Sequence, residues 1–317
     1  MKTVLFWDRC LNERGTSVAT FDYADYNERI LGNKSIVVGL NGSWRYSEQR
    51  YSDRFDLHMV DGLQDVQRVY DEMGCDCMYV QKSGEWDGLV LERGRNLIHV
   101  VFPHAEPHGD VYAYISEWLA DTMRPGAPWV PYMVNLPKHD RSMRDALGLP
   151  ASSFVFGWYG GNNFNISFAR EAVINAARIR RDAYFLFMNQ DAFCEEENIL
   201  FLPRTTDPAA KVQFINTCDA MVHARNQGET FGLAIAEFSL MNKPVITYDF
   251  HSPIDTEPEL AHIHMLGDAG IYYRDKQGLT DILVTLTHDN VAGRDWNRYG
   301  EFTPEAVMAR FDEVFLR

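Results

Sequence analysis

Two glutamates, Glu229 and Glu237, stand eight residues apart in a stretch that joins a glycine-bearing turn to a helix. The apolar run 220–224 has the length of a buried parallel strand, and apolar residues recur at helical spacing through 231–241. The start of such a helix offers unpaired backbone N–H groups and the positive end of a dipole, which suit a phosphate. A carboxylate accepts two hydrogen bonds, as a vicinal diol requires. The spacing therefore predicts a nucleotide-sugar site, with one acid for the sugar ring and one for the ribose.

The same stretch carries a resemblance to a known family. Residues 228–233 are Gly-Glu-Thr-Phe-Gly-Leu, and Lys-Pro-Val-Ile follows at 243–246. This pattern resembles the Glu-(seven residues)-Glu motif of retaining GT-B glycosyltransferases, family 4 (glycosyltransferase group 1) in particular, over roughly 154–286. The resemblance implies that Glu229 binds the donor sugar and Glu237 the ribose. It also implies that the helix start holds the diphosphate, through Thr230, Phe231, Gly232 and Leu233.

Strands and helices alternate along both halves of the chain, which predicts an α/β fold with parallel sheets. Four prolines between Pro125 and Pro137, followed by the charged stretch 138–144, indicate a linker. Together with the resemblance, this predicts two Rossmann-like doubly wound domains that face a cleft, as in the GT-B fold. We expect an acceptor-side domain at 1–137 and a donor domain at 138–302. A last helix within 303–317 is expected to cross back to the first domain.

Among the shorter elements, we expect a helix at 111–123, a strand at 129–134 and a helix at 258–266, with His262 and His264 on the surface of that last helix.

The segment after the strand 154–159 departs from the family pattern. The resemblance implies an Arg and a Lys that neutralise the diphosphate, but neither is present beside the glycines here. Backbone and amide donors can serve a phosphate instead, and they are expected from Gly160, Gly161 and Asn162. The missing positive charge is expected from Arg225 first, and then from Arg204 and Lys211.

The first half offers fewer candidates. Gly15 and Thr16 follow the first strand, where the family's glycine-rich loop approaches the donor phosphates. The resemblance also implies a histidine near the donor sugar, and of His104 and His108 we favour His108 because it is nearer to the expected helix start. The rings of Trp44, Tyr46 and Tyr51 are interpreted either as an acceptor groove, since sugar faces stack on rings, or as core.

Composition bounds the class of protein. The formal net charge of −15 argues against a long nucleic-acid partner, which needs clustered Lys and Arg. Five sparsely spaced cysteines are interpreted as reduced thiols. The N-terminus is too short in its apolar part for a signal peptide, and no run approaches eighteen apolar residues, so we expect a cytoplasmic protein without a membrane span.

These observations predict a retaining glycosyltransferase that uses a UDP- or GDP-linked sugar as co-substrate and needs neither a cofactor nor a metal. Its acceptor is expected to be a glycan or a small hydroxyl compound. The alternatives are a nucleotide-sugar 2-epimerase-like isomerase, a non-catalytic nucleotide-sugar-binding protein and, against the acidic charge, a transferase acting on modified DNA bases. The sequence does not indicate an oligomeric state.

Overall fold

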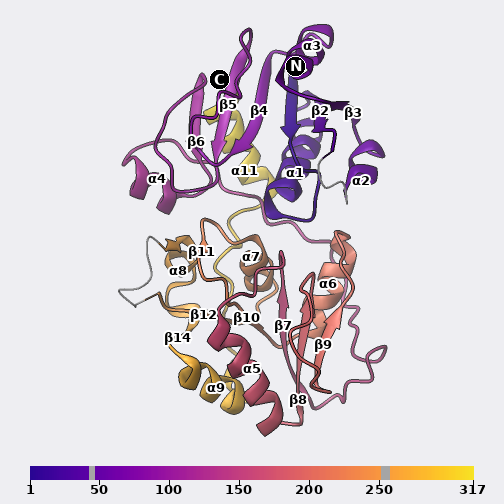
Figure 1. The fold of residues 1–317 in the computed structure, drawn as a ribbon, viewed down its shortest axis with the longest axis vertical. Coiled ribbons are helices and arrows are strands. Elements are labelled where there is room, and N and C mark those ends of the chain that lie inside the picture. The colour runs from indigo at the N-terminus through magenta and orange to yellow at the C-terminus, as the bar shows by residue number, and fades with distance from the viewer. Residues whose placement is uncertain (43–46, 251–257) are drawn as a thin grey trace. The chain divides into compact units, whose positions relative to one another are not determined.

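The computed structural model describes residues 1–42, 47–250 and 258–317, which divide into two compact units. Unit 1 comprises Met1–Met133 together with Phe302–Arg317, and unit 2 comprises Val134–Glu301. The sequence places these boundaries after residues 137 and 302. Each unit contains a parallel six-stranded sheet (Figure 1).

The sheet of unit 1 has the strand order β3-β2-β1-β4-β5-β6. The direction of winding reverses between β1 and β4, which is the topological switch point of a doubly wound sheet. Val4, Leu5 and Phe6 of β1 have no exposed surface, because helices cover both faces of such a sheet. The strands are β1 (Thr3–Asp8), β2 (Lys34–Leu40), β3 (Asp56–Val60), β4 (Cys77–Lys82), β5 (Arg95–Val100) and β6 (Val111–Tyr114).

The C-terminal segment completes the core of unit 1. The ring of Phe311 lies 5.1 Å from that of Tyr23 and 5.3 Å from that of Tyr79, and Phe315 meets Tyr79 edge-on at 5.5 Å. The helices of this unit are α1 (Gly15–Arg29), α2 (Glu48–Ser52), α3 (Leu63–Glu72), α4 (Glu117–Met123) and α11 (Pro304–Phe311), which continues as a π-helical turn at Asp312–Leu316.

The sheet of unit 2 has the order β14-β12-β10-β7-β8-β9 and reverses its winding between β7 and β10. A separate two-residue strand, β11 (Gly228–Glu229), pairs in parallel with β13 (Glu259–Leu260). The strands of the main sheet are β7 (Phe154–Tyr159), β8 (Ala183–Met188), β9 (Ile199–Leu202), β10 (Ala220–Val222), β12 (Val245–Tyr248) and β14 (Gly270–Tyr273).

Helices α5 and α9 of unit 2 lie side by side against the sheet (Figure 1). Phe214 of α6 and Phe238 of α7 pack against the ring of Tyr159 at 5.8 and 5.7 Å, so these two helices share a face. The helices are α5 (Ser167–Ile179), α6 (Pro208–Thr217), α7 (Leu233–Leu240), α8 (Ala261–Leu266), α9 (Lys276–Thr285) and α10 (His288–Val291), with a 3-10 turn at Gly267–Ala269.

Three of the expected elements are wrong. The helix expected at 111–123 is strand β6 followed by α4, which begins after the N-cap Ser116. The expected strand at 129–134 is reduced to one bridge between Trp129 and Tyr114. The helix expected at 258–266 begins only at Ala261, because Glu259–Leu260 pairs with β11.

Candidate active site

Glu229 lies in β11, between the end of β10 and the start of α7. Its Oε2 accepts a hydrogen bond from Arg225 Nη1 at 2.8 Å, and its Oε1 lies 3.4 Å from Nε2 of His223. Burial acts to raise the pKa of Glu229, but Arg225 and His223 together lower that pKa to about 2. The carboxylate is therefore ionised at neutral pH and is held from both sides.

A chain of hydrogen bonds extends from this carboxylate. His223 directly follows β10 and His262 lies in α8, and both side chains are buried. The hydroxyl of Thr247, in β12, lies 2.9 Å from Nδ1 of His223 and 3.3 Å from Nε2 of His262. Burial and the neighbouring His223 lower the pKa of His262 to about 3, so His262 is neutral. The chain runs from His262 through Thr247 and His223 to Glu229.

Arg225 is shared with a second buried carboxylate. Glu259 of β13 is 5% exposed, and its Oε2 lies 3.5 Å from Nη2 of Arg225. The same Nη2 donates to Gln227 Oε1 at 3.2 Å. Burial acts to lower the pKa of Arg225, but Glu229 and Glu259 raise it. Arg225, which was predicted to neutralise the diphosphate, is thus paired with two carboxylates.

Glu237 lies on α7 with 4% of its surface exposed. Its Oε1 accepts from Nζ of Lys211, on α6, and its Oε2 accepts from the hydroxyl of Tyr159, at the end of β7. The structure therefore brings together two predicted residues, Glu237 and Lys211. It adds Tyr159, which the sequence analysis did not assign to the site.

The start of α7 presents backbone groups. Gly232 is its N-cap with φ at 84°, a left-handed conformation that favours glycine. Thr230 and Phe231 are buried, and the Phe231 ring packs edge-on against Tyr299 at 5.6 Å. The Phe231 side chain therefore belongs to the core. What these residues and Leu233, the first residue of the helix, offer to a ligand is their N–H groups.

A second group of predicted residues is linked across the loops that follow β7, β8 and β9. Asn162 Oδ1 accepts from the backbone N–H of Asp191 at 3.1 Å, and Asn162 Nδ2 donates to the Asp191 carboxylate. Arg204 Nη2 donates to the same carboxylate at 2.9 Å. Gly160 and Gly161 precede Asn162 directly after β7. The carboxyl ends of the strands thus gather Asn162 and Arg204, as expected for a doubly wound sheet.

In unit 1, Gly15 and Thr16 form the first turn of α1 rather than a loop. His108 does not stand at a helix start, since β6 follows it. Its Nδ1 donates to the carbonyl of Glu106 at 2.7 Å, and its Nε2 accepts from Nζ of Lys82 at 3.0 Å. Both ring nitrogens of His108 are thus engaged within the unit.

Two interpretations of other residues require correction or stay open. Tyr51 is 1% exposed and donates its hydroxyl to Asp8, so it is core and not part of an open groove. Trp44 and Tyr46 lie outside the described residues. His262 is not on a helix surface as expected, because it has no exposed area.

Sequence reasoning missed His223, Thr247, His262, Glu259 and Tyr159 as members of the site. A usable signal existed for His223 and Tyr159, which stand at the carboxyl ends of the central strands β10 and β7. Glu259 and His262 had no such signal, because their place depends on the short pairing of β13 with β11.

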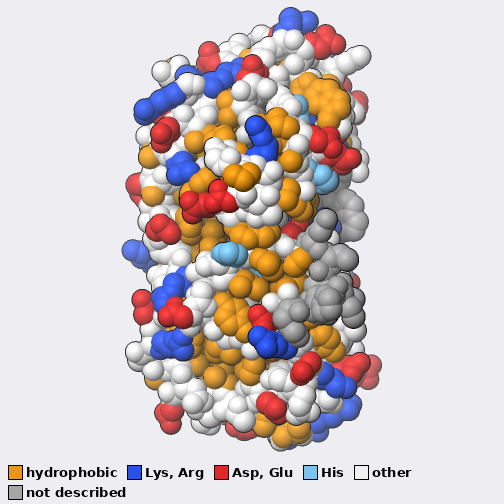
Figure 2. Space-filling model, turned by 90° about the vertical axis from the view of Figure 1, so that its left-hand side faces the viewer, with side chains coloured by type: hydrophobic (Ala, Val, Ile, Leu, Met, Phe, Trp, Pro, Cys, Tyr) orange, Lys and Arg blue, Asp and Glu red, His pale blue; other side chains and the backbone are white. Residues whose placement is uncertain are grey.

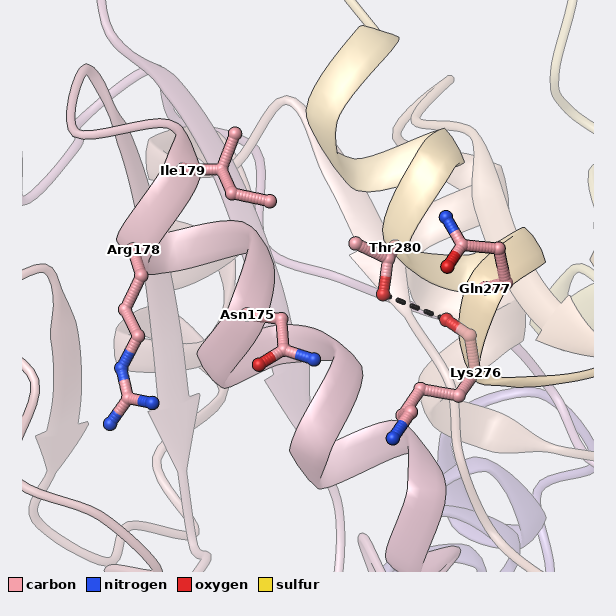
Figure 3. A pocket seen from close by; sticks show the side chains of 6 residues that line it. All are labelled: Asn175, Arg178, Ile179, Lys276, Gln277 and Thr280. Atoms are coloured by element: carbon pink, nitrogen blue, oxygen red, sulfur yellow. Dashed lines mark hydrogen bonds between the residues drawn. The ribbon is translucent and has the colours of Figure 1, made fainter.

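A cavity of about 380 Å³ lies elsewhere in unit 2, between α5 and α9 (Figure 3). On its α9 side the Thr280 hydroxyl donates to the carbonyl of Lys276 at 2.7 Å. None of the predicted site residues lines it, so it is separate from the groups described above. Its lining consists of Asn175, Arg178, Ile179, Lys276, Gln277 and Thr280.

The charge distribution agrees with the acidic composition. On the face shown in Figure 2, Lys and Arg side chains are interspersed with Asp and Glu and form no continuous basic surface among the described residues. No helix in the described part of the chain is long and apolar enough to cross a membrane. Nor do the described residues contain a group of three or more His, Cys, Asp or Glu side chains placed to hold a metal ion. All five cysteines are free thiols.

No family model and no curated protein matches the sequence. Solved structures do match it over nearly its whole length. Anabaena HepE, solved in complex with UDP-glucose, is 15% identical with a TM-score of 0.66, and the match covers 99% of this chain and 96% of that one. AviGT4, a glycosyltransferase involved in avilamycin A biosynthesis, is 14% identical with a TM-score of 0.64, covering 100% and 98%. The chain has the GT-B fold.

A putative UDP-N-acetylglucosamine 2-epimerase from Listeria monocytogenes shares this fold at 12% identity and a TM-score of 0.63, covering 98% of this chain and 96% of that one. The prediction of two doubly wound GT-B domains is confirmed. Because the GT-B fold is found in both transferases and an epimerase, the fold does not choose between these activities. Membership of family 4 stays a prediction.

Proposed function

We propose that this protein is a glycosyltransferase that moves a sugar from a UDP- or GDP-linked donor to a hydroxyl acceptor. The acceptor is proposed to be a glycan, and the anomeric configuration is retained. The observation that carries the proposal is Glu229, an ionised carboxylate held by Arg225 and His223 directly before the start of α7. The likeness to a GT-B protein solved with UDP-glucose supports a nucleotide sugar as the donor.

In the proposed reaction, the bond between the anomeric carbon and the β-phosphate oxygen breaks, and a bond to the acceptor oxygen forms on the same face. The proton of the acceptor hydroxyl passes to the departing phosphate oxygen. The fixed negative charge of Glu229 stabilises the oxocarbenium-like sugar. The N–H groups at the start of α7 stabilise the diphosphate, and Lys211 and Arg204 supply positive charge.

Two features support a diphosphate beside β7. A Cβ added at Gly160 or Gly161 would have no neighbour closer than 3.4 Å, so packing does not require glycine at either position. Glycine there leaves the backbone open to close approach by a ligand. Arg204 is paired with Asp191, which is 68% exposed, and such surface pairs contribute little and exchange readily for a stronger anion.

Glu237 is proposed to bind the ribose. Lys211 and Tyr159 each hold one of its oxygens, so the carboxylate is oriented before any ligand arrives. A carboxylate retains further lone pairs on both oxygens and accepts from a diol without losing these partners.

The test is a panel of UDP-, GDP-, ADP- and CMP-linked sugars, measured by thermal shift and by release of nucleotide with EDTA present. Binding to the folded state alone raises the melting temperature. We expect one donor to raise the melting temperature of wild type. The Glu237→Gln variant should bind that donor with an apparent affinity lower by about tenfold or more. Glu229→Gln should retain nucleotide binding and lose about 100-fold in turnover. Glu197→Gln, an exposed change in the same unit, is the matched control.

The products separate the transferase from the epimerase alternative. A transferase without acceptor releases free nucleotide and sugar slowly, whereas an epimerase returns a nucleotide sugar with one inverted ring carbon. Donor binding without either product would indicate a non-catalytic binding protein. If no donor on the panel raises the melting temperature of wild type, the proposed donor site is wrong.

A further inference from the structure

Glu259 is a buried carboxylate with no role in the mechanism proposed above. It lies in β13, opposite Gly228, and its backbone N–H donates to the carbonyl of Gln227 at 2.7 Å. A Cβ at Gly228 would lie 2.1 Å from the carbonyl oxygen of Glu259, so only glycine permits this approach. The ladder therefore fixes Glu259 to the segment that carries Arg225 and Glu229.

The guanidinium of Arg225 lies between two carboxylates that hold it unequally. Nη1 donates to Glu229 at 2.8 Å, a well-formed hydrogen bond, whereas Nη2 is 3.5 Å from Glu259 Oε2. Within the described residues, that oxygen is buried and has no hydrogen-bond partner. A buried carboxylate oxygen without a hydrogen bond is costly when ionised, so the arrangement favours a proton on Glu259.

We propose that Glu259 is a positioning residue for the donor-sugar site. Glu259 acts through Arg225, because its charge decides whether the guanidinium pairs with one ionised carboxylate, Glu229, or is shared between two. The inference rests on the proposed function and deepens it. With a neutral Glu259, Glu229 is the one ionised carboxylate that Arg225 contacts among the described residues. With an ionised Glu259, the two carboxylates compete for one cation, and the site gains a negative charge that opposes an anionic donor.

The pKa of Glu259 places the change in its ionisation near neutral pH, where Glu229 and His262 do not change. Burial raises the pKa of Glu259 to about 7, although Arg225 acts to lower it. Glu229 stays ionised and His262 stays neutral over that range, since their pKa values are about 2 and about 3. Among the described residues, His223 also faces Glu229, from the end of β10, and Tyr299 is a further titratable side chain near it.

The experiment measures the Kd of the donor found on the panel from pH 6 to pH 8.5, in wild type, Glu259→Gln and the exposed control Glu197→Gln. The intact nucleotide sugar is the probe, because a free nucleoside diphosphate has a terminal phosphate that itself titrates near pH 6. We expect wild type and the control to bind about fivefold more weakly at pH 8.5 than at pH 6. Glu259→Gln should keep the tighter Kd throughout, because an amide mimics the neutral acid.

A ligand-free measurement tests the ionisation independently. A folded pKa raised above the unfolded value stabilises the protein at low pH, and that contribution is lost as pH rises through about 7. The melting temperature of wild type relative to Glu259→Gln should therefore fall between pH 5 and pH 8.

The outcomes separate the two claims. If wild type binds the donor but Glu259→Gln retains the same pH dependence, another group titrates, and the inference about Glu259 is overturned while the proposed function stands. If wild type binds no donor at any pH, the proposed function fails, and the role of Glu259 in a donor site fails with it.

If Glu259→Gln does not fold, Glu259→Asp is the second variant. It keeps the charge and shortens the reach to Arg225, so it should bind the donor with an altered pH midpoint. An unaltered midpoint in that variant overturns the inference.

Discussion

Arg225 donates to one oxygen of Glu229, and His223 faces the other. Behind His223, the Thr247 hydroxyl lies within hydrogen-bonding distance of two buried imidazole rings. A hydroxyl both donates and accepts, so it satisfies one nitrogen of each ring when the rings are neutral. The orientation of Glu229 therefore depends on a residue two contacts away.

Replacing Thr247 by Val tests that dependence. Val has a similar shape but leaves Nδ1 of His223 and Nε2 of His262 buried without this partner. We expect a loss of about 1–3 kcal/mol in the free energy of unfolding, measured by urea denaturation, and a fall in turnover larger than the change in donor Kd. Thr285→Val on the exposed surface of α9 is the control and should change stability by less than about 0.5 kcal/mol. Wild-type stability and turnover in Thr247→Val would contradict the hydrogen-bonded chain.

The residues that sequence reasoning proposed for unit 2 are those whose chemistry is local. Glu229 and Glu237 were visible because one strand, one turn and one helix place them. The pairing of Lys211 with Glu237 was not visible, because it joins α6 to α7 across the sheet face. Thr247 lies beside His223 only because β10 and β12 are neighbours, and no spacing in the sequence encodes that contact.

At the scale of elements, the two-residue ladder of β11 with β13 holds the candidate site together. Gly228 has φ at 78° and faces the Glu259 carbonyl, so two separate constraints act on it. Gly293 has φ at 72° but nothing within 4 Å of an added Cβ. The two glycines therefore separate the cost of the backbone conformation from the cost of the close approach.

We expect Gly293→Ala to lose about 1 kcal/mol of unfolding free energy, which is the cost of the left-handed conformation alone. Gly228→Ala should lose clearly more, about 3 kcal/mol or above, because the ladder must also open. It should weaken donor binding as well, since opening the ladder displaces Glu229, which directly follows Gly228. Urea unfolding and thermal shift with donor measure the two effects. Equal losses for the two variants would show that the ladder is dispensable.

Long elements with a clear pattern were predictable, and short ones were not. The bounds of β7 agree with the strand predicted at 154–159. The four residues of β6 were predicted as part of the helix that follows, because Val, Tyr and Ala fit a strand or a helix over such a short length. Glu259–Leu260 is a strand only through its partner, so local propensity carries no information about it.

At the scale of the whole chain, each unit buries a histidine in its core. His99 of unit 1 has no exposed area, and its two ring nitrogens contact the Tyr79 hydroxyl at 2.6 Å and the Val130 carbonyl at 2.8 Å. Burial lowers the pKa of His99 to about 3. The pKa of His262 in unit 2 is lowered to about the same value by burial and by His223.

Both histidines make the protein sensitive to acid. A folded pKa below the unfolded value of about 6.5 contributes stability that is complete above pH 6.5 and is lost as pH falls toward 3. Glu229 adds a loss of the same sign as pH falls toward 2. We expect the free energy of unfolding to drop by on the order of 2 kcal/mol per histidine between pH 7 and pH 4.5. Urea titrations at several pH values measure this, and a flat profile over that range would contradict the buried neutral rings.

Residues 302–317 belong to unit 1, although all of unit 2 separates them from residues 1–133. During synthesis, the strands of unit 1 therefore emerge first but lack the rings of Phe311 and Phe315 that pack on Tyr23 and Tyr79. Unit 2 is contiguous and emerges complete before those rings do. The half of the chain that is made first is thus the half that finishes folding last, and until then its aromatic core is open to chaperones and to other nascent chains.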